Sequence, residues 1–369
     1  MGVIRILLSG ELWKLRKYRI WKNFLSDYKK NPLHMLRTFA IHRRGFTLSD
    51  WELQGLSKDN YKTYLTSRAY SGMHPINGYY SKIIDDKMVI KYVFSGTPVG
   101  KYMPDYYYLI DEQGVIRPMM DAGGLSRNPA VDDVVALLKE NGKLALKLIT
   151  GSIGKGFYKA EYKDGEFYVN DKQMSRDDFE TFVGSLRNYI VSEYLTTHPY
   201  LSTFWPDTAN TLRYLVGSVN GEWRLIKSYI RFGSKKSGVV ENFNAGGVLS
   251  YIDENGHFRG GYVMGKKGRQ SYSVAIDRHP DTNQVLDGDI PCWDEIRKCA
   301  EGIEKLLPQT KYLGFDFVVT DKDQVKLLEI NSLTSLDTIQ LDCSILDTEN
   351  GKWFFEHEQA AGHGGKERA

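Results

Sequence analysis

Residues 313–331 constrain the fold of this chain more than any other stretch, because two apolar runs flank a polar turn and each run carries an acid. The first run places Asp316 between two phenylalanines, and the second reads Val-Lys-Leu-Leu-Glu-Ile-Asn. Alternation along a strand predicts that Leu327, Glu329 and Asn331 share one face. The pattern therefore predicts an antiparallel hairpin with polar side chains gathered on one side.

The register of this hairpin decides whether its two acids meet. A four-residue loop at 321–324 pairs Thr320 with Val325 and sets Asp316 directly opposite Glu329. Facing side chains have Cβ atoms about 4.5–5.5 Å apart, and two carboxylates that close repel unless a positive charge lies between them. The amide of the nearby asparagine completes three hard oxygen ligands of the kind that Mg²⁺ accepts.

A surface hairpin with solvated acids is the alternative interpretation. Against it, Glu329 and Asn331 lie among apolar neighbours, which suggests a sheet that faces a core or a cleft. Acids in such a place need a partner. We therefore predict a metal site at Asp316, Glu329 and Asn331.

Composition describes a globular protein. The 369 residues are enough for two or three lobes, with 41% hydrophobic and 26% charged residues. A net charge of +3 gives no nucleic-acid signature. Cys292, Cys299 and Cys343 form neither a CxxC pair nor an even disulfide framework. Met1 to Leu8 is too short an apolar run for a signal or a membrane span, so we expect a cytoplasmic protein.

The N-terminal region is basic and helical in pattern. Residues 5–44 are rich in Lys, Arg, Trp and Tyr, with apolar residues at roughly helical spacing: Leu12, Leu15, Ile20, Trp21, Phe24, Leu25 and Tyr28. Such a helix either packs its apolar stripe on the rest of the protein or lies on the inner face of an anionic membrane. A second helix is predicted over 49–70, with Ser49 as N-cap and Glu52 three residues later.

The predicted organisation has five parts. They are a basic helical region (1–78), a small α/β lobe (79–142), a lid subdomain (143–197), a C-terminal subdomain with the metal site (198–359) and a disordered tail (360–369). Predicted helices cover 83–94, 131–140 and 292–307. Predicted strands cover 106–110, 143–149, 157–162, 166–169, 189–194, 211–219 and 222–230.

Cationic and glycine-rich signals precede the hairpin. Lys147 lies inside an apolar strand, and a buried lysine needs an anion. A glycine-rich turn follows, whose backbone N–H groups, with Ser152 and Lys155, could cradle phosphate: Thr150, Gly151, Ser152, Gly154, Lys155 and Gly156. The turn is not a P-loop, because no Gly-Lys-Ser/Thr closes it. Taken with the acids, the signals favour phosphate binding.

Three later segments extend the pattern. An apolar strand ends in Glu193, followed by Tyr194 and Leu195, and could offer backbone groups and a carboxylate to a nucleobase and its sugar. Asn-Thr-Leu-Arg at 210–213 places Arg213 where it could neutralise a γ-phosphate. A polar loop with a Gly-Gly step spans 240–247.

In this order the segments resemble the ATP-grasp superfamily of carboxylate–amine ligases, over about residues 83–340. The most specific parts are Gly-Phe-Asp at 314–316, Leu-Glu-Ile-Asn at 328–331 and the Asn-Thr-Leu-Arg motif; Asp-Lys-Met-Val-Ile-Lys at 86–91 is weaker. With the 242–247 loop and the basic N-terminus, the chain is most similar to the members associated with sugar transfer and to the teichuronopeptide type. The resemblance implies an α+β fold, in which two lobes grip ATP between antiparallel sheets, with a helical N-terminal extension.

The resemblance also implies roles for individual residues. Lys91 and Lys147 would hold the α- and β-phosphates under a lid at 150–156, and Glu193, Tyr194 and Leu195 would meet the adenine. Asp316, Glu329 and Asn331 would bind Mg²⁺, with Glu329 bridging two ions. Arg213 would face the γ-phosphate or an acyl phosphate, and Lys227 and Arg231 are further candidates for phosphate contacts.

The expected activity is ADP-forming ligation through an acyl phosphate, joining an amino acid to a uronic-acid-type sugar in bacterial surface polysaccharide biosynthesis. ATP, a small carboxylate and an amine donor are the expected partners, without nucleic acid. The rivals are a kinase acting on a sugar hydroxyl, a glycosyltransferase using the Asp-Gly-Asp triplet at 287–289, and a non-catalytic scaffold at a membrane surface. No protein-kinase signature is present.

Overall fold

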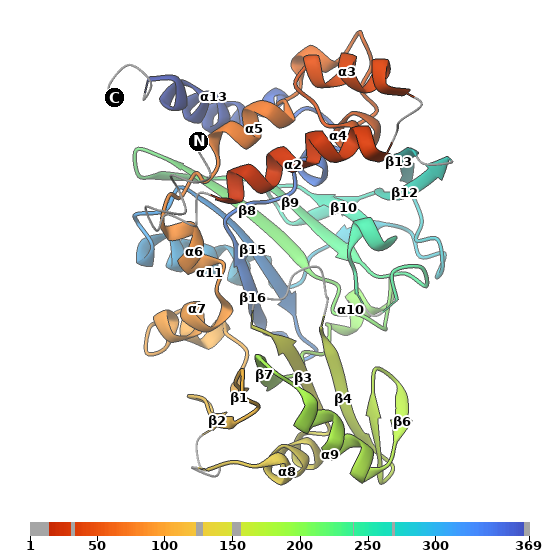
Figure 1. Cartoon of the computed structure of the whole chain (residues 1–369), viewed down its shortest axis with the longest axis vertical. Helices are drawn as coiled ribbons and strands as arrows, with labels where there is room; N and C mark the ends of the chain where they lie inside the picture. Colours follow the sequence, from red (N-terminus) through yellow and green to blue (C-terminus); the bar gives the residue numbers. More distant parts are fainter. Residues whose placement is uncertain are drawn as a thin grey trace.

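Two antiparallel sheets carry the fold of this protein (Figure 1). The computed structural model describes residues 15–30, 34–122, 128–149, 156–238, 240–267 and 270–364. Within these ranges, seven strands form a small sheet and nine strands form a large sheet. Helices flank both sheets, so the architecture is the predicted mixture of helices and antiparallel strands.

The small sheet is built from residues between 106 and 193. Its spatial order is β2 (Ile116–Pro118), β1 (Tyr106–Ile110), β7 (Tyr189–Glu193), β3 (Lys143–Leu148), β4 (Tyr158–Lys163), β5 (Glu166–Val169) and β6 (Lys172–Met174). Helices α8 (Val131–Asn141) and α9 (Arg176–Ser185) pack on it. Their apolar residues share a core with Leu144, Leu146 and Val191.

The large sheet has the order β13 (Gln270–Ile276), β12 (Gly261–Lys267), β10 (Val248–Ile252), β9 (Glu222–Phe232), β8 (Leu212–Val219), β15 (Tyr312–Val319) and β16 (Val325–Asn331). Strand β11 (His257–Arg259) pairs with β10 and with β14 (Asp287–Asp289). Every residue of β8 and β15 is buried, because both faces of the sheet are covered. Polar side chains on these central strands therefore require partners inside the protein.

Two separate cores cover the large sheet. On one face, α11 (Trp293–Leu306), α10 (Pro199–Ser202), α6 (Tyr80–Ile84), α7 (Lys87–Phe94) and η4 (Gly100–Tyr102) contribute to a core with Phe232, Phe315 and Phe317. The other face packs on a core containing Tyr312, Phe354 and Phe355, formed with the N-terminal and C-terminal helices. The elements that contribute to this core are α4 (Leu48–Leu53), α5 (Ser67–Met73), η5 (Phe243–Ala245), α12 (Leu336–Ile339), η6 (Ile345–Asp347) and α13 (Glu349–Gly364). The short η3 (Tyr61–Thr63) packs on a separate small core with Phe46.

The N-terminal helices α2 (Leu15–Lys30) and α3 (Met35–Arg43) pack on each other and on α5 and α4. Buried Asp27 joins them, because its carboxylate lies 2.9 Å from the His42 ring and accepts from the Leu48 backbone N–H. The inner side of this extension therefore packs on the protein, as one of the two sequence interpretations predicts.

The two long helices expected near the N-terminal half are broken in the structure. The stretch 49–70 holds only a short α4, which Thr47 rather than Ser49 caps, and α5 begins at Ser67. The stretch 83–94 divides into α6 and α7, because the Asp86 side chain accepts from two backbone N–H groups and starts a new helix. That break places Lys87 at the first position of α7.

The structure also divides the chain differently from the sequence analysis. The predicted lobe at 79–142 is not one body, since α6 and α7 pack with the large sheet while β1, β2 and α8 belong to the small sheet. Helix α13 continues to Gly364, so residues 360–364 are helical rather than disordered. Residues 365–369 lie outside the described ranges.

Candidate active site

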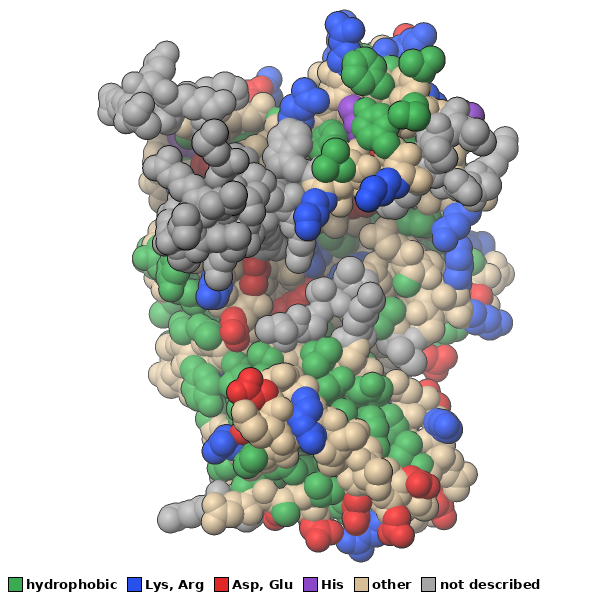
Figure 2. Space-filling view, in the orientation of Figure 1, with side chains coloured by type: hydrophobic (Ala, Val, Ile, Leu, Met, Phe, Trp, Pro, Cys, Tyr) green, Lys and Arg blue, Asp and Glu red, His purple; other side chains and the backbone are tan. Residues whose placement is uncertain are grey.

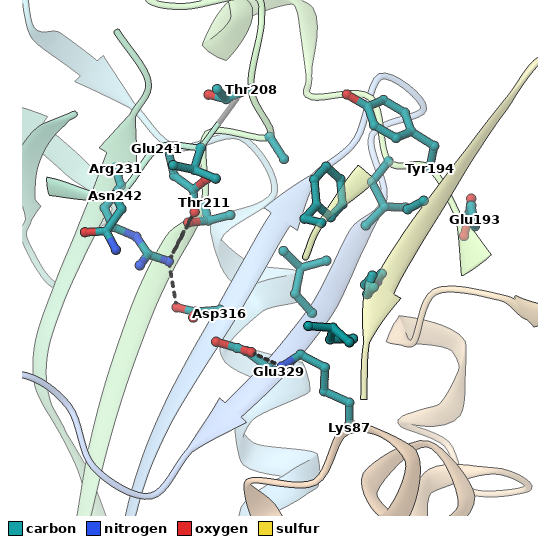
Figure 3. A pocket seen from close by; sticks show the side chains of 18 of the residues that line it. Lys87, Glu193, Tyr194, Thr208, Thr211, Arg231, Glu241, Asn242, Asp316 and Glu329 are labelled. Carbon is teal, nitrogen blue, oxygen red and sulfur yellow. Dashed lines mark hydrogen bonds and ion pairs between the residues drawn. The ribbon is translucent and has the colours of Figure 1, made fainter. Parts of the chain in front are cut away.

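A cavity of about 220 Å³ lies where the two sheets approach each other (Figure 3). Residues of the small sheet, and those that directly follow its strand β7, line one end of the cavity. The loops beside β8 and β9 line the other end, and β15 and β16 form the floor. The lining residues are Lys87, Ala145, Lys147, Leu148, Phe157, Glu193, Tyr194, Leu195, Asp207, Thr208, Ala209, Thr211, Arg231, Val240, Glu241, Asn242, Asp316, Leu328 and Glu329.

The hairpin that forms the floor pairs Asp316 with Glu329, as the sequence predicts, although the register of the strands nearer the turn differs from the predicted one. Strand pairing begins at Val319 and Val325 rather than at Thr320, which shifts the register by one residue. A bulge between Asp316 and Phe317 restores the pairing of the acids. The bulge also turns both Leu328 and Glu329 toward the cavity and leaves Leu327 in the core, which contradicts the predicted face.

Asp316 lies deep in the floor and is held by two arginines. Arg213 donates to both carboxylate oxygens, at 2.6 and 2.8 Å, and Arg231 Nη2 lies 3.1 Å from Oδ1. Burial favours the neutral acid, yet the arginines outweigh it and hold the pKa of Asp316 below its usual range. Asp316 is therefore an anion across the physiological pH range.

Glu329 is more accessible and has a different partner. Its Oε2 lies 2.6 Å from Lys87 Nζ, and its side chain is 30% exposed. The Asn331 amide nitrogen lies 3.2 Å from Glu329 Oε1 and 3.3 Å from Asp316 Oδ2. The three polar side chains named from the sequence are thus in mutual contact.

These three residues fit a Mg²⁺ site by their donor chemistry. The Asn331 amide group sits between one oxygen of Asp316 and one of Glu329. Turning the amide over would put its oxygen at the same place, beside two carboxylate oxygens, and hard oxygen donors are what Mg²⁺ takes. Glu329, Asp316 and Asn331 would then hold the ion, with Lys87 released from Glu329.

Apolar side chains form one part of the cavity lining, which we call the apolar slot. They are Ala145, Leu148, Phe157 and Leu195, with Leu328 of the floor, and such a lining suits a flat aromatic ring. Glu193, Tyr194 and Leu195 lie along one side of it, and Glu193 Oε2 accepts from the Asp105 N–H at 3.3 Å. Gly156, which precedes Phe157, has φ +71°, and a Cβ there would collide with Leu148, so this position requires glycine.

Lys147, which is half-buried, lines the cavity. Among the described residues its ammonium forms no ion pair or hydrogen bond, and its contact is with the face of the Tyr106 ring at 5.4 Å. Burial, followed by repulsion from Lys87, lowers the pKa of Lys147 to about 8. A half-buried ammonium with this lowered pKa is ready to pair with an incoming anion.

Nucleotide binding should therefore depend on pH through Lys147. Because its pKa is depressed, the free protein loses this proton above about pH 8, and a bound phosphate would restore it. We expect ATP affinity to fall by up to about tenfold per pH unit above that value, with proton uptake on binding. Calorimetry in buffers of different ionisation enthalpy measures both. Lys147→Arg, which stays charged, should remove the dependence, and an unchanged slope in that variant would contradict the assignment.

The far end of the cavity holds a second cluster of polar residues. Thr211 Oγ1 donates to Glu241 at 2.7 Å, and Arg231 Nη2 lies 3.6 Å from the same carboxylate. Arg231 Nε is buried and has no hydrogen-bond partner within the described part of the chain. In Figure 3 this cluster lies at the left next to Asp316, whereas Glu193 and Tyr194 lie at the right.

The Gly-Gly step explains the shape of the loop that carries Glu241. Gly246 has φ +112°, and a Cβ on Gly247 would meet the Glu241 carbonyl. The two glycines let the chain fold back against itself, and Asn242 stabilises the turn by accepting from the Asn244 N–H at 2.9 Å. The loop thereby brings Glu241 and Asn242 to the cavity wall.

Several residues named from the sequence do not reach this cavity. Arg213 is buried behind Asp316, and its remaining contact is with Thr334 Oγ1 at 3.1 Å, so its guanidinium does not face a ligand. Lys91 lies 2.5 Å from Asp121 and donates to the Pro104 carbonyl. Lys227 pairs with Asp342 in a separate cavity. Lys147, Glu193, Tyr194, Leu195, Arg231, Asp316 and Glu329 do line the site.

The predicted lid falls mostly outside the described ranges. Thr150, Gly151, Ser152, Gly154 and Lys155 belong to the undescribed residues, and only Gly156 of that set is placed. The Asp-Gly-Asp triplet at 287–289 lies within the described ranges, and both of its acids have partners. Asp289 lies 2.8 Å from the His257 ring, and Asp287 accepts a hydrogen bond from Arg259. Neither acid lines the cavity.

Some lining residues were not predicted. Lys87 is the main one, and its signal was available, because it directly follows the Asp86 N-cap in the motif at 86–91. Glu241 lies in a loop that the sequence marked without a role. The apolar slot residues carry no sequence signal, since leucine and alanine in strands are ordinary core residues.

The comparison with known families identifies the chain. The sequence model of the sugar-transfer-associated ATP-grasp family matches residues 72–349, which is most of the chain. This protein belongs to the sugar-transfer-associated ATP-grasp family. The match confirms the resemblance drawn from the motifs and, with it, the α+β ATP-grasp fold.

Solved structures of ATP-grasp ligases are among the matches to this chain. D-alanyl-alanine synthetase A from Vibrio cholerae shares 12% identity and a TM-score of 0.44, over 78% of this chain and 66% of that one. The ATP-grasp ligase PsnB, complexed with a minimal precursor, shares 12% identity and a TM-score of 0.39, over 77% of this chain and 63% of PsnB. The chain therefore spans less than two thirds of either protein. No curated protein matches this sequence.

Proposed function

We propose that this protein is an ATP-dependent carboxylate–amine ligase that releases ADP and acts through an acyl phosphate. Lys147 is the observation that carries the proposal, because a half-buried ammonium that has no anionic partner among the described residues lines a cavity whose floor holds two carboxylates. A cavity that combines an apolar slot, unsatisfied positive charge and oxygen donors is suited to a nucleotide with its metal ion.

In the first proposed step, an oxygen of the substrate carboxylate attacks the γ-phosphorus of ATP. A new P–O bond forms, and the bond to the bridging oxygen breaks as ADP leaves. No general base is needed, because a carboxylate with a pKa of about 4 is already ionised. Lys147 and Lys87 would neutralise the phosphates and align the two anions. Mg²⁺ held by Asp316, Glu329 and Asn331 would neutralise the charge that develops on the phosphoryl group.

In the second proposed step, the amine nitrogen attacks the acyl carbon and forms the C–N bond. The C–O bond to phosphate breaks, inorganic phosphate leaves, and the nitrogen loses a proton. We assign the amine substrate, which accepts the acyl group, to the end of the cavity that holds Thr211, Arg231 and Glu241. Glu241 would attract the amine, and Arg231 Nε is available to a carboxylate or phosphate oxygen.

We further propose that the amine donor is an amino acid and that the substrate carboxylate belongs to a uronic-acid-type sugar. The family's association with sugar transfer supports a sugar substrate. A cytoplasmic place in bacterial surface polysaccharide assembly follows from the need for ATP and an activated sugar. The same proposal includes a second Mg²⁺ ion, for which Glu329 would also be a ligand.

Oxygen tracing tests the reaction. The full chain is incubated with Mg–ATP, amino acids and uronic-acid sugars whose carboxylate carries ¹⁸O, and products are analysed by mass spectrometry. The ligase transfers one ¹⁸O from the carboxylate to inorganic phosphate and forms an amide. A phosphorylated sugar that retains all its carboxylate ¹⁸O would overturn the ligase in favour of the hydroxyl kinase, and release of a nucleoside diphosphate from a nucleotide sugar would favour the transferase.

A further inference from the structure

The outer side of helices α2 and α3 exposes large apolar side chains. Leu36 is 86% exposed, Leu25 69%, Phe39 56% and Met35 55%. Leu36 and Leu25 are the two most exposed large hydrophobic residues in the described part of the chain. Figure 2 shows hydrophobic side chains gathered over these helices with Lys and Arg around them. We call this set, with Lys22, Lys29 and Arg43, the α2–α3 face.

The spacing on each helix explains why these residues share an outward side. On α2, Lys22, Leu25 and Lys29 follow one another at three and four residues, and all three are exposed. On α3, Leu36, Phe39 and Arg43 do the same, while Thr38, Ile41 and His42 point inward. The helices therefore pack by their inner sides and present apolar residues beside cations outward.

Basic residues are concentrated in the N-terminal part of the sequence, which contains these two helices. Residues 1–44 contain eleven Lys and Arg against two acids, whereas the whole chain has 49 against 46. The remaining residues thus hold 38 basic against 44 acidic side chains and are net negative. Of the two acids in the first 44 residues, Asp27 is buried against His42 and does not offset the surface charge.

We propose that the α2–α3 face docks the protein on an anionic lipid bilayer. Exposed leucine and phenylalanine suit the boundary between headgroups and acyl chains, and flanking lysine and arginine suit anionic headgroups. An acidic protein would match the cations but not the protruding apolar side chains, which favour an apolar boundary layer. None of the helices described in the structure is long and apolar enough to cross a membrane, so contact would be peripheral.

Docking there leaves the active site open. The face lies on the N-terminal helices, which cover one core of the large sheet, while the cavity lies at the end of that sheet nearest the small sheet (Figure 1). The protein could thus act on a substrate made or consumed at a membrane surface. The docking proposal does not depend on which reaction the cavity performs.

Vesicle co-sedimentation of the full chain tests this proposal. The wild type should bind vesicles of phosphatidylcholine with phosphatidylglycerol but not pure phosphatidylcholine, and high salt should weaken binding. Lys22→Gln with Lys29→Gln and Arg43→Gln should weaken binding by about a hundredfold, since each cation near an anionic surface contributes about fivefold. Leu36→Ser with Phe39→Ser should lose at least about tenfold at unchanged charge.

Matched control variants show whether a loss of binding comes from the α2–α3 face or from any loss of surface charge or exposed apolar side chains. Lys163→Gln with Lys172→Gln and Lys305→Gln removes the same charge from exposed sites elsewhere, and Val115→Ser with Val285→Ser removes exposed apolar residues elsewhere. Both should bind as the wild type does, and all variants should keep the wild-type melting temperature. Equal binding by the α2–α3 variants, or no binding by the wild type, overturns the proposal. A wild-type dimer that Leu36→Ser with Phe39→Ser makes monomeric overturns it too, since a second copy then covers the face.

Discussion

Glu329→Gln is expected to reduce ADP release in Mg–ATP by about a thousandfold or more. The substitution keeps the size of the side chain and removes the charge that pairs with Lys87 at 2.6 Å and that would hold the metal ion. Asp316 alone cannot replace it, because Arg213 and Arg231 already neutralise the charge of the Asp316 carboxylate. Steady-state measurement of ADP release gives the effect on kcat and KM separately.

The same variant should fold normally. Glu329 is 30% exposed in its side chain, and its loss removes one partly solvated ion pair, worth about 1 kcal/mol or less. Glu254→Gln, at an acid that lines other cavities, is the matched control and should keep full activity. Wild-type turnover in Glu329→Gln would exclude the metal-binding role of the hairpin.

Arg213→Met is expected to cause the largest loss of stability, about 3–5 kcal/mol in the free energy of unfolding. Arg213 is 6% exposed and forms a two-pronged ion pair with Asp316, which is 3% exposed. Removing the arginine leaves a buried carboxylate with Arg231 and Asn331 alone. Urea denaturation followed by tryptophan fluorescence measures the change, and Arg213→Lys should be intermediate because it keeps the charge but loses the fork geometry.

A double variant distinguishes the ion pair from simple packing. Arg213→Met with Asp316→Leu removes both charges, and we expect its cost to fall short of the sum of the single costs by about 2 kcal/mol. Arg224→Met breaks an exposed ion pair with Glu222 and should cost less than about 1 kcal/mol. Strictly additive costs in the double variant would mean that the pair contributes nothing of its own.

The hairpin shows how far local sequence patterns reach. Two apolar runs around a polar turn predicted the strands and the meeting of Asp316 with Glu329, and both are present. The details differed, since the loop is one residue longer than predicted and a bulge compensates for it. A period of two residues marks which side chains alternate, but a bulge is an insertion into that period and leaves no regular trace.

The lysines of α7 show where the sequence is insufficient. Lys87 and Lys91 are four residues apart on one helix, and either could be the phosphate ligand from spacing alone. Packing decides between them, because Lys91 is buried against Asp121 and the Pro104 carbonyl while Lys87 reaches Glu329. The sequence shows that Asp86 can act as an N-cap and break the helix. It does not show which groups the two lysines contact.

The arginines lead to the same conclusion. The motif at 210–213 marked Arg213 as important, yet strand order sets what it does. Pairing of β15 with β8, and of β8 with β9, brings Arg213 against Asp316 and Arg231 to the cavity beside it. A guanidinium whose donors are taken by a buried acid cannot also face a ligand, so Arg231 rather than Arg213 lines the cavity.

By itself, the sequence determined the strands of the hairpin and of the segments before β10, except β2 and β6, and it also determined the acids and amide of the floor, the lysine of β3, the family and the basic N-terminus. These features are local, because alternation, turn residues and charge runs involve neighbours in the chain. Only the tertiary structure decided which cation meets which anion and which side chains line the cavity. Arg213 and Asp316 are 103 residues apart, and such contacts depend on strand order and helix packing, which no local pattern encodes.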